Sequence, residues 1–306
     1  MKKFFLLFFL ISFTSCSPII ENTEIERSSV SDISFEEGSG ETFSKVSPEV
    51  LHSILHITHE EFLQSVNNPR SYETHGFIHA GVVPHHTTAA TLISGFFSSA
   101  AAFADYYDLV IILAPNHAND FANVITSCRD WDIDDGVFTH KGFVADLIDA
   151  RGVNAAISHS HIEGDHSAAV LIPYVNYYLP GVKVAPVLLG NSMRFDEIIN
   201  FYNWLENWIS ESGENVLLIA SIDFSHFLTA PEAAEKDIET ASAIMSLDFL
   251  RIYSMCNHYL DSPAAMIVFL KYLGSLGLEP RIIDNADATE FLGRLCETTS
   301  YFIITN

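Results

Sequence analysis

Short apolar runs alternate with longer amphipathic segments along most of this chain. The apolar runs are rich in β-branched residues and end at Pro, Gly, Asn or Asp, which is typical of buried strands. Strands are expected at about 77–83, 109–113, 153–158, 182–189, 216–222, 281–284 and 300–305. Helices are expected at about 49–67, 88–104, 140–150, 166–178, 195–210, 231–246 and 263–274. This alternation predicts a single three-layer α/β/α domain over residues 49–306, with a mostly parallel or mixed central sheet.

The N-terminal segment breaks this pattern. Residues 1–16 combine two lysines with an apolar run from Phe4 to Phe13, which is the arrangement of a signal peptide. The run is too short to span a bilayer as a stable helix. The stretch FTSC, which ends at Cys16, resembles a bacterial lipobox, so we expect a lipoprotein signal peptide, cleavage before Cys16 and lipidation of its thiol. An ordinary signal peptide cleaved near the same residue is the alternative.

Residues 17–48 are rich in Ser, Glu and Gly and show no sustained periodicity. This composition predicts a flexible acidic tether between the lipid and the domain. We therefore expect an extracytoplasmic, membrane-anchored bacterial lipoprotein whose membrane contact is made through the lipidated Cys16.

Replacing Cys16 with Ser is expected to release the protein from the membrane. Stable attachment needs two hydrophobic signals, which a diacylglyceryl group and a further acyl chain on Cys16 would supply. Detergent partitioning of the two proteins measures the effect, and equal partitioning would show that Cys16 is not the anchor.

Charge and cysteine content narrow the function classes. The chain has 15 Lys and Arg against 39 Asp and Glu, a formal net charge of −24. A nucleic-acid partner is therefore not expected, because neutralising phosphates needs a basic face.

Three cysteines follow Cys16, namely Cys128, Cys256 and Cys296, and no two of them form a CxxC pair. This spacing excludes a cysteine zinc cage.

Several of the 14 histidines come directly after expected strands. His85 follows VVP, His117 follows LAPN and His226 follows IDFS, while His166 lies in the stretch GDHS. The carboxyl ends of parallel strands line the ligand crevice of an α/β sheet, so these side chains can converge although they are distant in sequence. Two neutral imidazoles with one anionic ligand and open positions suit a divalent first-row metal, especially iron(II).

Three residues near these histidines offer the anion. Asp261 precedes the helix expected at Pro263, Asp223 lies three residues before His226, and Cys256 could supply a thiolate. Structural alternatives exist for two of them. Asp261 could merely cap the helix, and Cys256 could be a small buried apolar residue.

Seven short motifs occur in a recognisable order. They are VPHH (83–86), LAPNH (113–117), DHS (165–167), PVLLG (186–190), SIDFSHF (221–227), SPAAMIVFL (262–270) and TSYFIIT (299–305). Together they resemble the Memo family, whose prokaryotic members are called AmmeMemoRadiSam system protein B, over roughly residues 75–306. The resemblance implies the α/β fold of class III extradiol dioxygenases, in which two histidines and one acidic residue hold iron and a further histidine serves as acid/base.

Carried over by motif, the resemblance makes His85 and His117 metal ligands. It makes His226 the catalytic histidine that moves a proton and Asp223 the carboxylate that orients it. The implied cofactor is a divalent transition metal, with iron(II) expected and copper as the alternative.

The third metal ligand departs from the family pattern. Memo-type proteins carry a cysteine a few residues before the Pro of the late helix, and the residue four before Pro263 is Tyr259. We expect Asp261 to be the third ligand, which would restore the two-histidine, one-carboxylate set of the dioxygenases. The alternatives are that Cys256 reaches the metal, or that the metal site is lost.

Two functions follow from this resemblance, and whether the protein is an enzyme is left open. The first is a metal-dependent redox enzyme, similar to the dioxygenases, that acts on an unknown small substrate. The second is a non-catalytic metal-binding or scaffold lipoprotein that retains the fold, because kinship of fold does not fix chemistry. Stoichiometric metal without oxygen consumption on a panel of catechols would favour the second.

Overall fold

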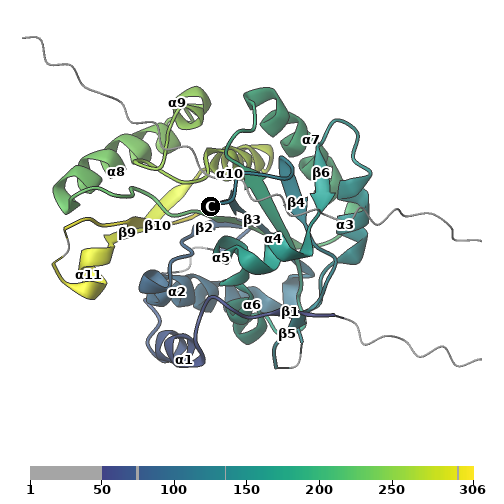
Figure 1. The fold of residues 1–306 in the computed structure, drawn as a ribbon, viewed down its shortest axis with the longest axis horizontal. Coiled ribbons are helices and arrows are strands. Elements are labelled where there is room, and N and C mark those ends of the chain that lie inside the picture. The colour runs from purple at the N-terminus through teal and green to yellow at the C-terminus, as the bar shows by residue number, and fades with distance from the viewer. Residues whose placement is uncertain (1–49, 74–75, 135, 295) are drawn as a thin grey trace, which may run out of the picture. The chain divides into compact units, whose positions relative to one another are not determined.

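The computed structural model describes residues 50–73, 76–134, 136–294 and 296–306, which belong to one compact unit, Pro48–Asn306 (Figure 1). The signal peptide expected over residues 1–16 and the tether expected over 17–48 lie outside the described residues. Both therefore stay predictions.

The strands of the described residues are two to eight residues long. They are β1 (His52–Ser53), β2 (Ala80–Val83), β3 (Leu109–Asn116), β4 (Val124–Thr126), β5 (Trp131–Asp132), β6 (Ala155–Ile157), β7 (Lys183–Gly190), β8 (Val216–Ser221), β9 (Arg281–Asp287) and β10 (Ser300–Thr305). The α-helices are α1 (His59–Asn67), α2 (Ala90–Ala100), α3 (Lys141–Ile148), α4 (His159–Gly164), α5 (His166–Ala169), α6 (Ile172–Tyr178), α7 (Phe195–Ser212), α8 (Ala230–Met245), α9 (Phe249–Tyr253), α10 (Pro263–Ser275) and α11 (Ala288–Leu292). Two 3₁₀ helices, η1 (Thr87–Ala89) and η2 (Ala101–Tyr106), flank α2.

Eight of these strands form one mixed sheet, in the order β6-β4-β7-β3-β8-β2-β10-β9. The central strands β7, β3, β8 and β2 run parallel to one another, whereas β10 is antiparallel to β2 and β9, and β4 is antiparallel to β7. The expected mixed sheet is thus confirmed. Its parallel centre brings the carboxyl ends of four strands to one edge.

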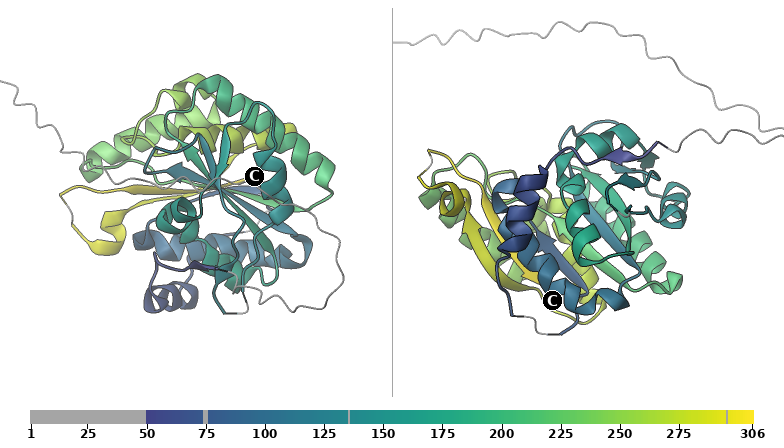
Figure 2. Two further views of the ribbon diagram at one scale, coloured as in Figure 1. Left: turned by 45° about the vertical axis from the view of Figure 1, so that its right-hand side comes forward. Right: turned by 90° about the horizontal axis from the view of Figure 1, so that it is seen from below.

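Helices cover both faces of the sheet (Figure 2). Along β3, Leu109, Ile111 and Leu113 pack on the side of α3, α7 and α10, whereas Val110 and Ile112 pack on the side of α2 and α6. This alternation follows from the two-residue period of a strand and explains why every residue of β3 is buried.

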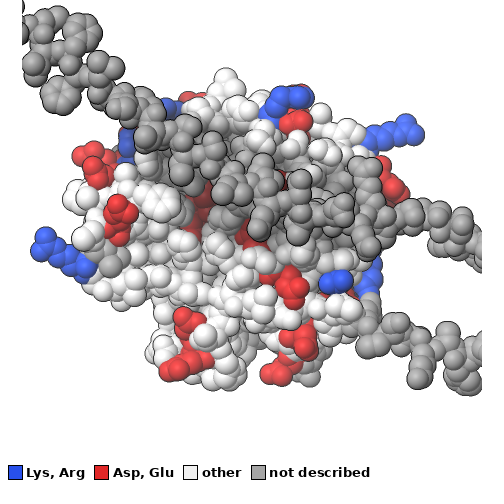
Figure 3. All heavy atoms as spheres, in the orientation of Figure 1, with Lys and Arg blue, Asp and Glu red and all other residues white. Residues whose placement is uncertain are grey.

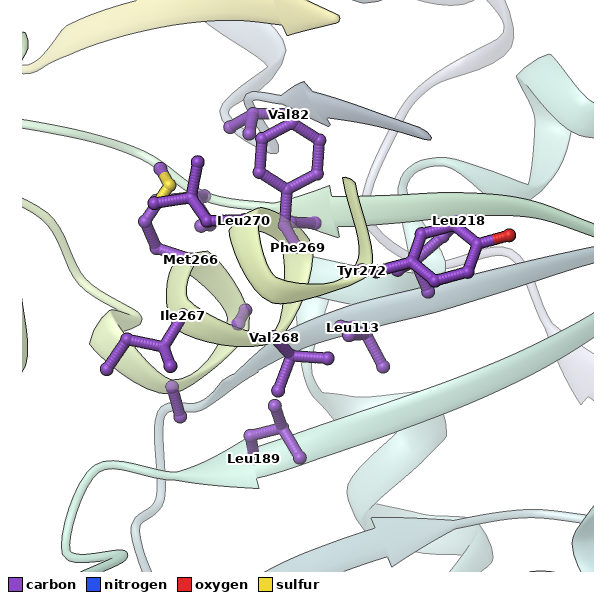
Figure 4. Packing of buried hydrophobic residues seen from close by; sticks show 14 of the residues in the cluster. Val82, Leu113, Leu189, Leu218, Met266, Ile267, Val268, Phe269, Leu270 and Tyr272 are labelled. Carbon is purple, nitrogen blue, oxygen red and sulfur yellow. The ribbon is translucent and has the colours of Figure 1, made fainter. Parts of the chain in front are cut away.

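Helix α10 is the most deeply buried helix on its face. Nine of its residues are buried, and Figure 4 shows Val268 near Leu113 and Leu189, and Phe269 beside Val82. Apolar residues surround this helix on nearly all sides, as expected for a helix inside the core. The position of its N-terminus, next to the site described below, is therefore fixed by core packing.

Two expected helices were wrong in their extent. The chain first forms the short strand β1, within the range expected to be helical. Helix α1 begins only after Thr58, whose hydroxyl accepts a hydrogen bond from the backbone N–H of Glu61 (3.2 Å). The helix expected over 166–178 is divided into α5 and α6, with Pro173 in the first turn of α6. Proline has no N–H to continue a helix and is favoured in a first turn, which accounts for the break.

Candidate metal centre

The carboxyl ends of three neighbouring parallel strands carry the candidate residues. Strands β3, β8 and β2 are adjacent in the sheet and run in the same direction. His85 and His86 lie just beyond β2, His117 directly follows β3, and Asp223 and His226 follow β8. The sheet therefore brings together histidines that are up to about 140 residues apart in the chain, as the strand-end pattern predicted.

His85 is buried, and a partner behind the ring fixes its tautomer. Its backbone N–H donates to Asp223 Oδ1 (3.0 Å), and its ring Nδ1 lies 3.2 Å from Ser221 Oγ. The Ser221 hydroxyl donates its only proton to the carbonyl oxygen of Ser167 (2.5 Å), so it can only accept from Nδ1–H. The lone pair of His85 therefore sits on Nε2. Burial lowers the pKa of His85 to about 4, which keeps the ring neutral at pH 7.

His117 is held in the same way by a carboxylate. Its Nδ1 lies 2.9 Å from Asp165 Oδ1, and its backbone N–H donates to Asp165 Oδ2 (2.9 Å). Burial alone would raise the pKa of Asp165, but the hydrogen bonds from His117 and from the backbone N–H of Ser167 hold it well below its usual range. Burial alone would lower the pKa of His117, but the hydrogen bond and the charge of Asp165 raise it. The ionised Asp165 accepts the Nδ1 proton, so a metal would bind His117 at Nε2, once that nitrogen carries no proton.

Asp261 is buried without a hydrogen bond to either carboxylate oxygen. It does not cap α10, because Ser262 is the N-cap residue and its hydroxyl accepts from the backbone N–H of Ala265 (3.4 Å). Its backbone N–H donates to the carbonyl oxygen of Asp223 (3.1 Å). Burial raises the pKa of Asp261 to about 6, so the carboxyl group is still mostly ionised at pH 7.

These three side chains point their unpartnered atoms at one another. Asp261 Oδ2 lies 3.2 Å from His85 Nε2 and 3.9 Å from His117 Nε2. A carboxylate oxygen that faces two imidazole lone pairs is repelled unless a cation or a proton lies between them. Ligand atoms bound to one metal ion at about 2.1 Å stand roughly 3.0–3.5 Å apart, so the observed spacing is close to that of a metal centre. The residues present fit a divalent metal ion.

His166 lies beside the two predicted histidine ligands. Its ring stacks on that of His117 with a centroid distance of 4.5 Å, and one ligand atom each of His85, His117 and His166 lie within 4.8 Å of one another. Burial, together with the charges that His85 and His117 can carry, lowers the pKa of His166 to about 3. His117 and His166 also line a cavity of about 310 Å³, which is large enough for a small molecule.

The structure places Asp223 differently from the expectation that it orients His226. Asp223 Oδ2 lies 3.0 Å from Nδ1 of His86 and 3.6 Å from Nε2 of His85. Within the part of the chain that the structure describes, no hydrogen bond joins the side chains of Asp223 and His226. Burial lowers the pKa of His226, which favours the neutral ring. The assigned roles of His226 and Asp223 stay predictions.

Sequence analysis missed His86, Asp165 and Ser221 as members of the site. The sequence did contain a signal for His86, because it directly follows His85 and therefore lies beyond the end of the same strand. Asp165 and Ser221 lay inside recognised motifs, but their role depends on hydrogen bonds across the sheet edge, which a sequence pattern does not contain.

Cys256 lies at the margin of this region. Cys256 and Cys296 are exposed and Cys128 is half-buried, and all three have free thiols. Cys256 shares with Asp261 the lining of a second cavity, of about 220 Å³. The two clusters of metal-ligand side chains found in the described residues contain neither Cys256 nor Asp261. Asp261 joins the site through its contacts with His85 and His117.

Comparisons with known proteins agree with this architecture. A family model described as "Memo-like protein" matches residues 46–294. A MEMO1 family protein of Methanosarcina acetivorans is 27% identical over 243 residues, which cover 75% of this chain and 82% of that protein. A MEMO1 family protein of Methanosarcina mazei is 31% identical over 153 residues, which cover 48% of this chain and 54% of that protein.

A solved structure shares the fold. The crystal structure of an uncharacterized protein from Escherichia coli K12 matches with a TM-score of 0.50 and 12% sequence identity, covering 74% of this chain and 98% of that one. A likeness at this identity concerns the arrangement of the elements alone.

Proposed function

This chain belongs to the Memo family, and from that membership and the geometry of the site we propose that it is a metal-dependent redox enzyme that acts on a small substrate. His85, His117 and Asp261 would hold the metal, with iron(II) as the first expectation and copper as the alternative. The observation that carries the proposal is the meeting of two imidazole lone pairs and a buried carboxylate, none of them satisfied by a protein donor. When bound, such a metal supplies a Lewis-acidic, redox-active centre with open positions.

Residues that do not bind the metal themselves fix the orientation of its ligands. Ser221 and Asp165 orient His85 and His117 so that Nε2 of each ring faces the centre, and neither ring has to turn before it binds. The cavity lined by His117 and His166 places a small ligand next to the centre. His166 stays neutral because of its lowered pKa, so it can accept a hydrogen bond from a hydroxyl group of that ligand.

Elemental analysis and oxygen uptake together test the proposed function. The anaerobically purified protein should contain at least one metal ion per chain and consume oxygen with a member of a catechol panel. The His85→Ala and His117→Ala variants should lose one equivalent of metal together with the oxygen uptake, and the exposed-histidine variant His59→Ala should keep both. Metal without oxygen uptake on any member of the panel would favour the non-catalytic metal-binding protein.

Replacing His226 with Gln is expected to separate catalysis from metal binding. His226 is buried, and its lowered pKa favours a neutral ring that can accept a proton. Loss of a general acid or base reduces turnover by about 100-fold or more. The variant loaded with one equivalent of iron(II) should keep that metal while turnover falls. A variant that loses this metal would make His226 a ligand, and one with full turnover would make it structural.

We further propose that the protein works on the outer side of the membrane, attached through Cys16. The lipobox-like FTSC and the Ser- and Glu-rich segment that follows it support this location.

A further inference from the structure

A second group of ligand side chains adjoins the first. One ligand atom each of His86, Asp223 and His226 lie within 4.8 Å of one another. Asp223 is fully buried, His226 is 8% exposed and His86 is half-buried, so the group is largely enclosed and is accessible to solvent on the side of His86. None of the three belongs to the set His85, His117 and Asp261.

The polar atoms of this second group lack partners. Asp223 Oδ2 and His226 Nδ1 are buried and accept or donate no hydrogen bond. His86 Nδ1 lies 3.0 Å from Asp223 Oδ2, but not in hydrogen-bonding geometry. Leaving such atoms without a partner costs roughly 1–3 kcal/mol each, and native proteins seldom leave several together. A ligand that supplies positive charge would satisfy both the carboxylate and the imidazole lone pairs.

The buried carboxylates of this region also lack a permanently charged partner. In the described part of the chain, the ion pairs of Asp165, Asp223 and Asp261 are all with histidines, whose rings are neutral unless protonated. On the face shown in Figure 3, most of the visible Lys and Arg side chains lie toward the outline of the molecule. Asp223 and Asp261 are both buried, and among the described residues no Lys or Arg pairs with either carboxylate. Buried charge of this kind is costly unless it is paired.

We propose that His86, Asp223 and His226 form a second site for a divalent first-row metal ion, next to the one at His85, His117 and Asp261. Two imidazoles and one carboxylate are a ligand set that manganese, iron, cobalt and zinc accept. Asp223 Oδ2 lies 3.6 Å from His85 Nε2, so the two sites are contiguous. When the second ion is bound, the imidazole of His226 is a metal ligand. When only the first site is loaded, the imidazole of His226 is free to carry a proton.

Titration of the metal-free full chain with Mn²⁺, followed by electron paramagnetic resonance, tests this proposal. Manganese prefers oxygen and imidazole to thiol ligands, so the exposed Cys256 and Cys296 do not compete. The wild-type protein should bind two Mn²⁺ ions per chain and show the magnetic coupling of a close pair. His86→Gln and His226→Gln should each bind one ion without coupling, and the control His59→Gln should bind two.

The outcomes separate the second site from the first. One ion in the wild-type protein, kept in His86→Gln and His226→Gln but lost in His117→Gln, would overturn the second site and leave the proposed function standing. One ion that is lost in His86→Gln and kept in His117→Gln would support the second site and contradict the first. His86 is half-buried, so its substitution is not expected to unfold the protein, and melting of each metal-free variant verifies this.

Discussion

Replacing Asp261 with Ala is expected to remove the first equivalent of metal as completely as replacing His85 does. Asp261 Oδ2 is the atom that both imidazole lone pairs face, at 3.2 Å from His85 and 3.9 Å from His117. Loss of an outer partner of a metal ligand costs about 10–100-fold in affinity, and loss of the ligand itself should cost more than about 100-fold. Titration of the metal-free variant with iron(II) under anaerobic conditions measures this loss.

Two matched variants make this result specific. Ser221→Ala removes the group that fixes the tautomer of His85 but no ligand, so its affinity should fall by about 10–100-fold only. Cys256→Ser should bind metal like the wild-type protein, because Cys256 is exposed, whereas Asp261 is buried with an oxygen that faces both histidines. Full binding by Asp261→Ala together with loss in Cys256→Ser would show that the cysteine holds the metal.

The Asp261→Asn variant is expected to have opposite effects on the metal-free and the metal-loaded protein. In the metal-free protein, burial raises the pKa of Asp261 to about 6 from the usual Asp value of 3.8. The folded state therefore binds the proton more tightly than the unfolded state, and stability falls as the pH rises from about 4 through about 6. At 1.36 kcal/mol per pKa unit the loss amounts to roughly 3 kcal/mol at pH 7.

Asparagine keeps the shape of the side chain but cannot ionise, so the metal-free variant should escape this loss. At pH 7 it should melt about 6–12 °C above the metal-free wild-type protein, and the difference should disappear near pH 4. Metal should reverse the order, since ligand at 1,000 times its dissociation constant stabilises the wild-type protein by about 4.1 kcal/mol, which exceeds this loss. Thermal melts at both pH values, with and without iron(II), measure all four states; a metal-free variant that melts below the wild type at pH 7 would contradict the burial argument.

The central strands could be predicted from sequence because they are buried on both faces. β3, β7 and β8 are nearly continuous apolar runs, which is the pattern of strands buried in a parallel sheet. The short strands β4 and β5 could not be predicted in this way. They pair through two or three residues each, so their backbone hydrogen bonds depend on neighbours that are distant in sequence.

The site was predictable to the extent that it follows strand ends. His85 and His117 each lie one or two residues beyond a buried strand, so the rule for parallel sheets placed them together. Asp261 is set by a different element, α10, whose packing against the sheet brings its N-terminus to the same edge. The pairing of Asp223 with His86 instead of His226 depends on side-chain directions in the turn after β8, for which the spacing of residues carries no information.

The most direct test of the account is anomalous diffraction from crystals of the protein loaded anaerobically with one equivalent of iron(II). The account predicts a single strong iron peak within bonding distance of Nε2 of His85, Nε2 of His117 and a carboxylate oxygen of Asp261. An iron peak bound to the sulfur of Cys256, or no iron peak at the edge of the sheet, would contradict it.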